Sequence, residues 1–209
     1  MPVQKSILKK CIFILISFNS GVAMSVSEPK YKLDSKNEHY EIRSYSPIIV
    51  AETLIEGDFA EAGSKAFAIL ADYIFGKNTS KQKIEMTAPV AQQKLSEKIE
   101  MTAPVSQIED RRGHLVQFTM PSNYTIETLP QPLDSRVTLK EIGSRTLAVY
   151  PYSGSWSESR YRAKLSEFNL ELAKNKIPTK GEPVFARYNS PFQLWFLRRN
   201  EIWLEISER

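Results

Sequence analysis

The sequence predicts an α+β fold in which one unit of two strands, a helix and further strands occurs twice. Apolar residues alternate with polar ones in several short stretches, which is the period of half-buried strands. Two longer stretches carry apolar residues at helical spacing, each behind a capping residue. The motif Gly57-Asp58-Phe59 is matched 97 residues later by Gly154-Ser155-Trp156, and Ala51 is matched by Ala148 at the same offset. We therefore expect an internal duplication with pseudo-twofold symmetry, with halves at about 38–125 and 135–207.

The first unit begins with two short strands, expected at residues 40–44 and 48–55 with Ser46-Pro47 as the turn between them. A helix is expected from Asp58, because Asp58 is a favourable N-cap and Glu61 follows three residues later, as in a capping box. Gly76 is the residue type that ends a helix. A further strand is expected over residues 114–120.

An octapeptide occurs twice between this helix and that last strand, as Lys83–Val90 and, unchanged, as Lys98–Val105. In each copy the apolar residues fall on alternate positions, and a proline, which cannot donate a backbone hydrogen bond, comes near the end. The pattern predicts two strands joined by a polar loop. We expect the apolar side chains to be buried and the glutamates to be exposed, namely Ile84, Met86, Ile99 and Met101 in the first set and Glu85 and Glu100 in the second.

The second unit follows a proline-rich link at residues 129–132. Strands are expected at residues 137–142 and 145–150, before a helix that Ser155 caps with Glu158 three residues later. The apolar residues of this helix form one narrow stripe, which is enough to seat a helix on a sheet: Tyr161, Leu165, Phe168 and Leu172.

The N-terminus has the pattern of a signal peptide. Three lysines precede a short apolar run, Cys11–Phe18, and small residues follow it. A membrane anchor is the alternative, but the run has about half of the ~20 residues that span a bilayer. We expect residues 1–23 to be a signal peptide, cut after Ala23 or Ser25, residues 24–37 to be a flexible leader, and residues 38–209 to form one domain. The protein would then be exported, to the periplasm or the medium.

Charge and composition exclude several classes of function. The formal charge of the chain is +4, and loss of the three lysines with the signal peptide leaves 4 − 3 = +1. A nearly neutral chain without a basic cluster gives no electrostatic basis for binding nucleic acid. The one cysteine, Cys11, leaves with the signal peptide. The two histidines, His39 and His114, lack metal-ligand spacing. We therefore predict no catalytic residue and no metal site, and we interpret Met86, Met101 and Met120 as core residues.

The first helix carries more apolar surface than it needs to pack on a sheet. Its apolar arc spans about 200° on a helical wheel. One side can face the sheet, and a flanking stripe of mostly small residues remains: Ala60, Gly63, Phe67, Ala71 and Ile74. Lys65 is the nearby base. The stripe is either a surface that a flat ligand can approach closely, with Phe67 and Ile74 as contacts, or a seat for the connector at residues 77–82 or for the loop between the octapeptides.

Several of these segments carry a resemblance. The octapeptides match Lys-Ile-x-Met-Thr-Ala-Pro-Val, a signature of the SOUL/heme-binding protein family. Four more segments of the family pattern occur in the same order between about Tyr31 and Ile206: Tyr40-Glu41-Ile42-Arg43, Met120-Pro121-Ser122, Tyr188-Asn189-Ser190-Pro191 and Arg199-Asn200-Glu201-Ile202-Trp203-Leu204. The likeness covers nearly the whole chain after the signal peptide.

The resemblance implies a distorted antiparallel β-barrel made of two related halves, with one helix packed on each. It also implies non-covalent binding of a tetrapyrrole, heme or porphyrin, in a shallow groove beside the first helix, which gives Gly63, Lys65, Phe67, Ala71 and Ile74 as candidate site residues. Some animal members have histidine, proposed as an iron ligand, where this chain has Ser44. We therefore expect apolar contact without a histidine ligand.

The function expected from the sequence is that of a non-enzymatic carrier or buffer of a tetrapyrrole, a monomer without a stable membrane span. The alternative is a module that binds another apolar or cationic small molecule, or a protein segment, without heme. A buried carboxylate inside the barrel would favour a cationic ligand, whereas an open apolar groove flanked by Lys65 would favour a tetrapyrrole.

Overall fold

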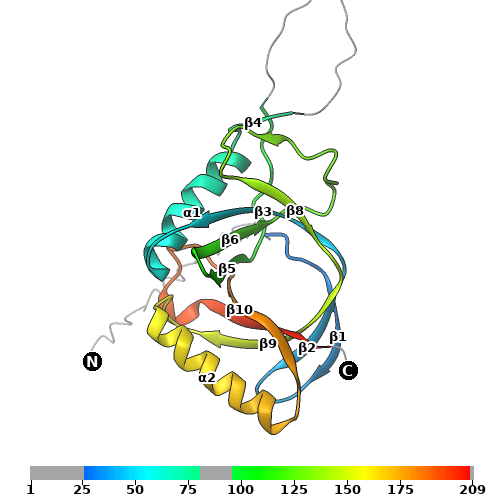
Figure 1. The fold of residues 1–209 in the computed structure, drawn as a ribbon, viewed down its shortest axis with the longest axis vertical. Coiled ribbons are helices and arrows are strands. Elements are labelled where there is room, and N and C mark those ends of the chain that lie inside the picture. Colours follow the sequence, from blue (N-terminus) through cyan, green and yellow to red (C-terminus); the bar gives the residue numbers. More distant parts are fainter. Residues whose placement is uncertain (1–25, 81–95, 208–209) are drawn as a thin grey trace, which may run out of the picture.

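Two helices lie on the outside of one strongly curled antiparallel sheet in the computed structural model, which describes residues 26–80 and 96–207 (Figure 1). No helix within those ranges is long and apolar enough to cross a membrane. The elements are β1 (Tyr31–Lys36), β2 (Glu41–Tyr45), β3 (Ile48–Ile55), α1 (Phe59–Ile74), β4 (Asn78–Thr79), β5 (Val105–Asp110), β6 (Gly113–Thr119), β7 (Gln131–Pro132), β8 (Thr138–Ile142), β9 (Arg145–Ser153), α2 (Glu158–Lys174), β10 (Thr179–Arg187), the 3-10 helix η1 (Trp195–Leu197) and β11 (Arg199–Ile206).

The order of the strands shows the duplication directly. In the described residues the large sheet runs β1-β2-β9-β11-β10-β5-β6-β3-β8. This order is reversed when each strand is replaced by its counterpart in the other half, that is, when β2 is exchanged with β8, β9 with β3, β11 with β6 and β10 with β5. Strand β1 has no counterpart and is an addition at one edge. The central strands β5 and β10 pair with each other, with Phe185 opposite Gln107 at the pseudo-twofold axis. The predicted fold class, a distorted antiparallel barrel of two pseudo-symmetric halves, is confirmed.

Helix α1 begins and ends where its capping residues predict. The Asp58 carboxylate accepts a hydrogen bond of 2.8 Å from the backbone N–H of Glu61. The helix ends at Ile74, and Gly76 follows with φ of +119°, a backbone conformation that favours glycine. Its inner face packs on β3 and β6 through Ala66, Leu70 and Tyr73, which are buried. This packing forms the core of the first half.

Helix α2 begins two residues later than the sequence predicts. Its N-cap is Ser157, which makes no side-chain capping bond, and its first residue is Glu158. The hydroxyl of Ser155, the expected cap, instead lies 3.3 Å from Nε of Arg160 and 3.2 Å from the Ser157 hydroxyl. The predicted stripe does seat the helix on β10 and β11, because Tyr161, Phe168 and Leu172 are buried with Phe185 and Ile202.

The second octapeptide is not a strand over most of its length, so that prediction was wrong. Strand β5 begins only at Val105. The preceding backbone bonds to segments outside the sheet: the N–H of Ile99 donates to the carbonyl of Ile74 (2.8 Å), and that of Ala103 donates to Ser27 (2.9 Å). Ile99 is buried and Glu100 exposed, as expected, and Met101 is half-buried. The first copy, with Ile84, Glu85 and Met86, lies outside the described residues.

The expected flexible leader contains a strand. Tyr31–Lys36 forms β1, which pairs with β2 at the edge of the sheet, with Tyr31 opposite Tyr45. All of its side chains are exposed, and its two apolar residues, Tyr31 and Leu33, are too few to mark a strand in the sequence. The pairing follows from the free edge of β2, which offers backbone partners to any extended segment that reaches it.

Candidate functional site

The structure closes two positions of the stripe that the sequence singled out on α1, Gly63 and Ile74. Gly63 is buried, and a Cβ built on it would lie 2.9 Å from guanidinium Nη1 of Arg187 and 2.9 Å from Oε1 of Gln107. The space beside Gly63 is thus filled by the side chains of Arg187 and Gln107 and is not open to a ligand. Ile74 is 1% exposed and belongs to the hydrophobic core, with Ile99 beside it. A following segment therefore covers the Ile74 end, but Ile99 belongs to the second octapeptide and not to the connector or the loop that the alternative named.

The middle of the stripe remains partly open. Phe67 and Ala71 are half-buried, and the Phe67 ring stands edge-on to Phe118 of β6 with a centroid distance of 5.3 Å. Lys65 is exposed and lies 2.6 Å from the Glu61 carboxylate. Further exposed residues continue this side of the helix: Ala60, Ser64, Ala68 and Phe75. Of the five predicted site residues, Phe67, Ala71 and Lys65 can meet a ligand in this arrangement; that they do so stays a prediction.

The histidines and methionines take ordinary structural places. His39 is exposed ahead of β2, whereas His114 is buried in β6 with its ring edge-on to Phe59. Met120 is buried in the core of the first half, and Met101 packs against that core, as predicted. Across the described ranges no three His, Cys, Asp or Glu side chains are grouped so that they could hold a metal ion.

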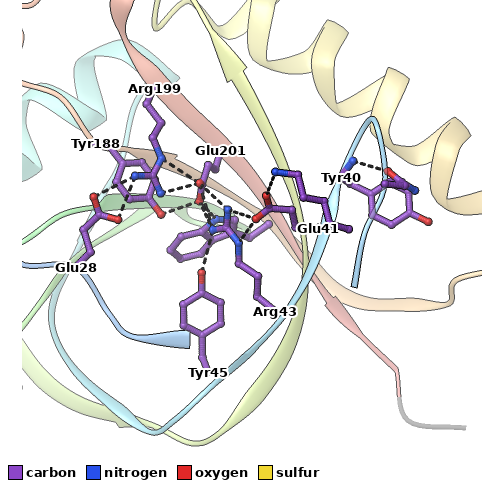
Figure 2. Close-up of polar contacts among 11 residues, drawn as sticks. Glu28, Tyr40, Glu41, Arg43, Tyr45, Tyr188, Arg199 and Glu201 are labelled. Atoms are coloured by element: carbon purple, nitrogen blue, oxygen red, sulfur yellow. Dashed lines mark hydrogen bonds and ion pairs between the residues drawn. The ribbon is translucent and has the colours of Figure 1, made fainter. Parts of the chain in front are cut away.

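The concave side of the sheet holds a buried ionic network that the sequence did not reveal (Figure 2). Its centre is the carboxylate of Glu201 on β11, which is 0% exposed. The guanidinium of Arg43 on β2 donates to both carboxylate oxygens at 3.1–3.2 Å. Three more side chains donate to the same carboxylate, namely Arg199 (2.9 Å), Tyr188 (2.6 Å) and Trp203 (2.8 Å). Arg199 also bonds Glu28 at 3.1 Å, and Arg43 bonds Glu41 at 2.7 Å.

These contacts decide the charge of Glu201. Burial would raise the pKa of its carboxyl, but Arg43, Tyr188 and Arg199 together lower that pKa below the usual value, so the group stays ionised. Burial and the same carboxylate hold the pKa of Tyr188 well above its usual range, which keeps its hydroxyl a donor. The buried carboxylate that would mark a cationic ligand is therefore present. Its four acceptor positions are, however, already taken by the protein's own donors.

A cavity of about 470 Å³ lies at one end of the curled sheet. Its walls come from the segment that leads into β1, the turn between β2 and β3, and the segment after β6. Apolar residues such as Ile48, Met120 and Tyr124 line it together with three carboxylates, those of Glu28, Glu127 and Glu141, and one amine, that of Lys30. No residue of α1 reaches it.

An exposed apolar loop joins β10 to β11, and sequence reasoning missed it too. It starts beside α1, because Arg187, the last residue of β10, packs against Gly63. Most apolar residues of this loop follow one another directly in the sequence instead of alternating with polar ones. Their spacing therefore fits neither the period of a strand nor that of a helix. That mismatch is the signal that could have marked the loop as a surface feature.

The fold of this chain is shared with other proteins of known structure. The C-terminal domain of EcmrR has a similar structure, with a TM-score of 0.57 over 86% of this chain and 99% of that domain, at 12% sequence identity. A hydrolase from Listeria innocua matches with a TM-score of 0.51 over 83% of this chain and 94% of its own, at 13% identity. At such identities the likeness shows a shared duplicated α+β fold alone.

Sequence relatives define the family. The model of the SOUL heme-binding protein family matches residues 26–205, so the chain belongs to this family. Human heme-binding protein 2 is 30% identical over 173 residues, which cover 79% of this chain and 77% of the human protein. Heme-binding protein 2 of the mouse is 29% identical over 174 residues, 82% of this chain and 80% of its own.

Proposed function

We propose that this protein binds a tetrapyrrole, heme or porphyrin, non-covalently on the outer side of α1, and acts as a carrier or buffer without catalysing a reaction. The observation that carries the proposal is the half-open apolar patch of Phe67 and Ala71 beside the exposed Lys65, on a chain of a heme-binding family. Small residues on the same side, Ala60 and Ala68, leave room for a flat macrocycle. The Lys65 amine can meet a propionate.

The binding is by apolar contact without a histidine ligand to iron. His114 is buried beneath α1, and His39 lies outside the helix-covered face on the approach to β2. Ser44 bonds Asp34 and lies 3.4 Å from the hydroxyl of Thr146. Burying even ~200 Å² of apolar surface is worth roughly 5 kcal/mol before association costs, at ~25 cal/mol per Å². Iron-free porphyrin should therefore bind about as well as hemin.

Parallel titrations of hemin and protoporphyrin, followed by absorbance and by quenching of tryptophan fluorescence, test the proposal. Phe67→Asp should weaken both ligands by at least about tenfold, since it places a charge where a ring should lie. Leu170→Asp is the matched control, because Leu170 is 69% exposed on the corresponding helix α2. Loss of binding in His39→Ala or His114→Ala, or a strong preference for hemin, would contradict the unligated mode. Failure of the unmodified protein to bind either ligand would refute the function.

The cavity favours a second candidate, binding of an apolar cation at the end of the sheet. Three carboxylates against one amine give its walls a net negative charge. The ligand would rely on Glu141 among the wall carboxylates, because Glu28 is paired with Arg199 and Glu201 is saturated by Arg43 and Arg199. Titration with a lipophilic cation, with Glu141→Gln as the variant, distinguishes this candidate: saturable binding that the variant weakens would support it.

We further propose that the protein is exported and acts as a monomer. The lysine-flanked apolar run that ends at Ala23 supports export. The intact mass of protein from its native cell should correspond to a chain that starts near Met24 or Val26, and a full-length cytoplasmic chain would contradict export. Light scattering should give the mass of a single chain in solution if the protein is a monomer.

A further inference from the structure

The loop between β10 and β11, Asn189–Arg198, carries five large apolar side chains that are each more than half exposed. The exposed fractions are 95% for Phe192, 58% for Leu194, 55% for Trp195, 53% for Phe196 and 57% for Leu197. Trp195 and Phe196 touch only edge to face, at a centroid distance of 5.6 Å. Five large apolar side chains exposed within one loop are unusual on a protein surface and mark an interaction site.

The loop is held in this shape by its own hydrogen bonds. The guanidinium of Arg198 donates to the carbonyl oxygens of Gln193 (2.9 Å) and Pro191 (2.7 Å), and it lies 4.2 Å from the ring centroid of Trp156. The backbone N–H of Gln193 donates to Ser190, and that of Arg199 donates to the Asn189 side chain. The apolar side chains are therefore presented outward by a braced loop.

The charges around the loop have one sign. No acidic residue occurs from Tyr188 to Asn200, and Arg198 and Arg199 close the segment. Arg199 is neutralised by Glu201 and Glu28, whereas no carboxylate partner of Arg198 occurs among the residues that the structure describes. The base of the apolar loop is thus cationic.

We propose that this loop docks the protein on an anionic lipid bilayer. Tryptophan and phenylalanine side chains favour the boundary between headgroups and acyl chains, and a cation at the base of an apolar tip is attracted by anionic headgroups. The loop inserts Phe192, Trp195 and Phe196 into that boundary and places Arg198 at the phosphates.

The size of the patch favours a bilayer over a protein partner. Large side chains offer about 150–250 Å² each, so five of them at these exposures present on the order of 600 Å². A stable protein interface buries about 800 Å² on each partner and needs a complementary shape. A bilayer needs no complementary shape. The docking does not rest on tetrapyrrole binding, although the loop starts beside α1 and would bring that helix close to the membrane.

Co-sedimentation of the full chain with vesicles tests the proposal. The vesicles contain phosphatidylcholine alone or phosphatidylcholine with about a third phosphatidylglycerol. The double variant Phe192→Asp/Trp195→Asp should reduce binding to the anionic vesicles by at least about tenfold relative to the unmodified chain. Leu170→Asp, on the outer face of α2, should leave binding unchanged. All chains share the same N-terminus, so any contribution from residues 1–25 cancels.

Three results would overturn the proposal. Equal sedimentation of the unmodified chain and the double variant would show that the loop does not dock. If the double variant fails to bind protoporphyrin in the absence of lipid but still binds vesicles, the loop belongs to the ligand site. A dimer in light scattering that the double variant abolishes, again with vesicle binding intact, would make a second copy the partner. Both substituted side chains are exposed, so near-ultraviolet circular dichroism should confirm that the variant folds.

Discussion

The two halves of the molecule share one frame but fill it differently on the concave side. Ala148 and Ala51 are equivalent positions in the two halves. When residues are counted from them along the paired strands, Glu201 corresponds to Leu115 and Arg43 corresponds to Lys140. In the α2 half these positions hold a buried ion pair. In the α1 half they hold a half-buried leucine and an exposed lysine. The duplicated backbone therefore does not require the charges; one half alone has acquired them.

The outer faces differ in the opposite sense. Helix α2 is seated by three buried residues and exposes mainly polar ones apart from Leu170, whereas α1 buries seven and still leaves apolar surface at Phe67, at Ala68 and at its C-cap Phe75. A helix that keeps apolar surface in water after it has packed has surface available for a ligand. The comparison shows a fixed internal network in the α2 half and supports the proposal that a ligand contacts the α1 half.

The largest effect should come from removing the charge at the centre of the network. Glu201→Gln removes the carboxylate that Arg43 and Arg199 share and leaves each with one carboxylate partner, Glu41 or Glu28; breaking a buried pair in this way costs about 3–5 kcal/mol. Urea unfolding measures the loss. Glu205→Gln, on the same strand but partly exposed, should cost less than about 1 kcal/mol. A loss below about 1 kcal/mol for Glu201→Gln would show that the two halves do not differ in what holds them.

Lowering the pH should destabilise the same α2 half. Burial raises the pKa of the Glu201 carboxyl, but Arg43 and its other donors outweigh burial and hold the folded pKa below 4.5, the ordinary value. A carboxyl with a lowered folded pKa contributes stability that is complete above the unfolded pKa and is lost as the pH falls through the folded pKa. Unfolding free energies should therefore fall below about pH 4.5. The fall should be shallower in Glu201→Gln, and equal slopes would contradict this assignment.

The octapeptide allows a comparison within the α1 half. Ile99→Ala should cost about 2–5 kcal/mol, because Ile99 is 2% exposed in the core beside Ile74. Ile84→Ala is the same change in the first copy. The identical sequences of the two copies predict the same loss for both, so a much smaller loss for Ile84 would show that the two copies do not share one environment.

The smallest effect is expected at Lys65. Its pair with Glu61 is exposed on both sides, so Lys65→Ala should change the unfolding free energy by less than about 1 kcal/mol. The affinity for a tetrapyrrole should fall by a few-fold as the attraction of a propionate is lost. An affinity loss as large as that of Phe67→Asp would show that charge, rather than apolar contact, holds the ligand.

Sequence patterns predicted what depends on neighbouring residues. The start of α1 follows from Asp58, and the stripe of α2 follows from its own helical period. What failed depends on partners far along the chain. The backbone of the second octapeptide bonds Ser27 and Ile74, and Arg43 meets Glu201 across a separation of 158 residues. Edge strand β1 has too few apolar residues to mark it.

The residues of the candidate site show the same difference between what local spacing predicts and what distant contacts decide. Phe67 and Ala71 remain accessible, as their place on the helical wheel predicts. Gly63 and Ile74 share that stripe but are closed by Arg187 and Ile99, which no helical wheel contains. Periodicity thus located the side of the helix that keeps apolar surface, and packing between distant segments decided which part of it stayed open.

Hydrogen–deuterium exchange with and without protoporphyrin tests most directly that the ligand surface belongs to the α1 half. We predict slower exchange within residues 60–71 on binding, with residues 158–174 of α2 and the strand that carries Glu201 unchanged. Protection confined to the cavity walls at residues 27–30 and 119–127, or to α2, would contradict the assignment.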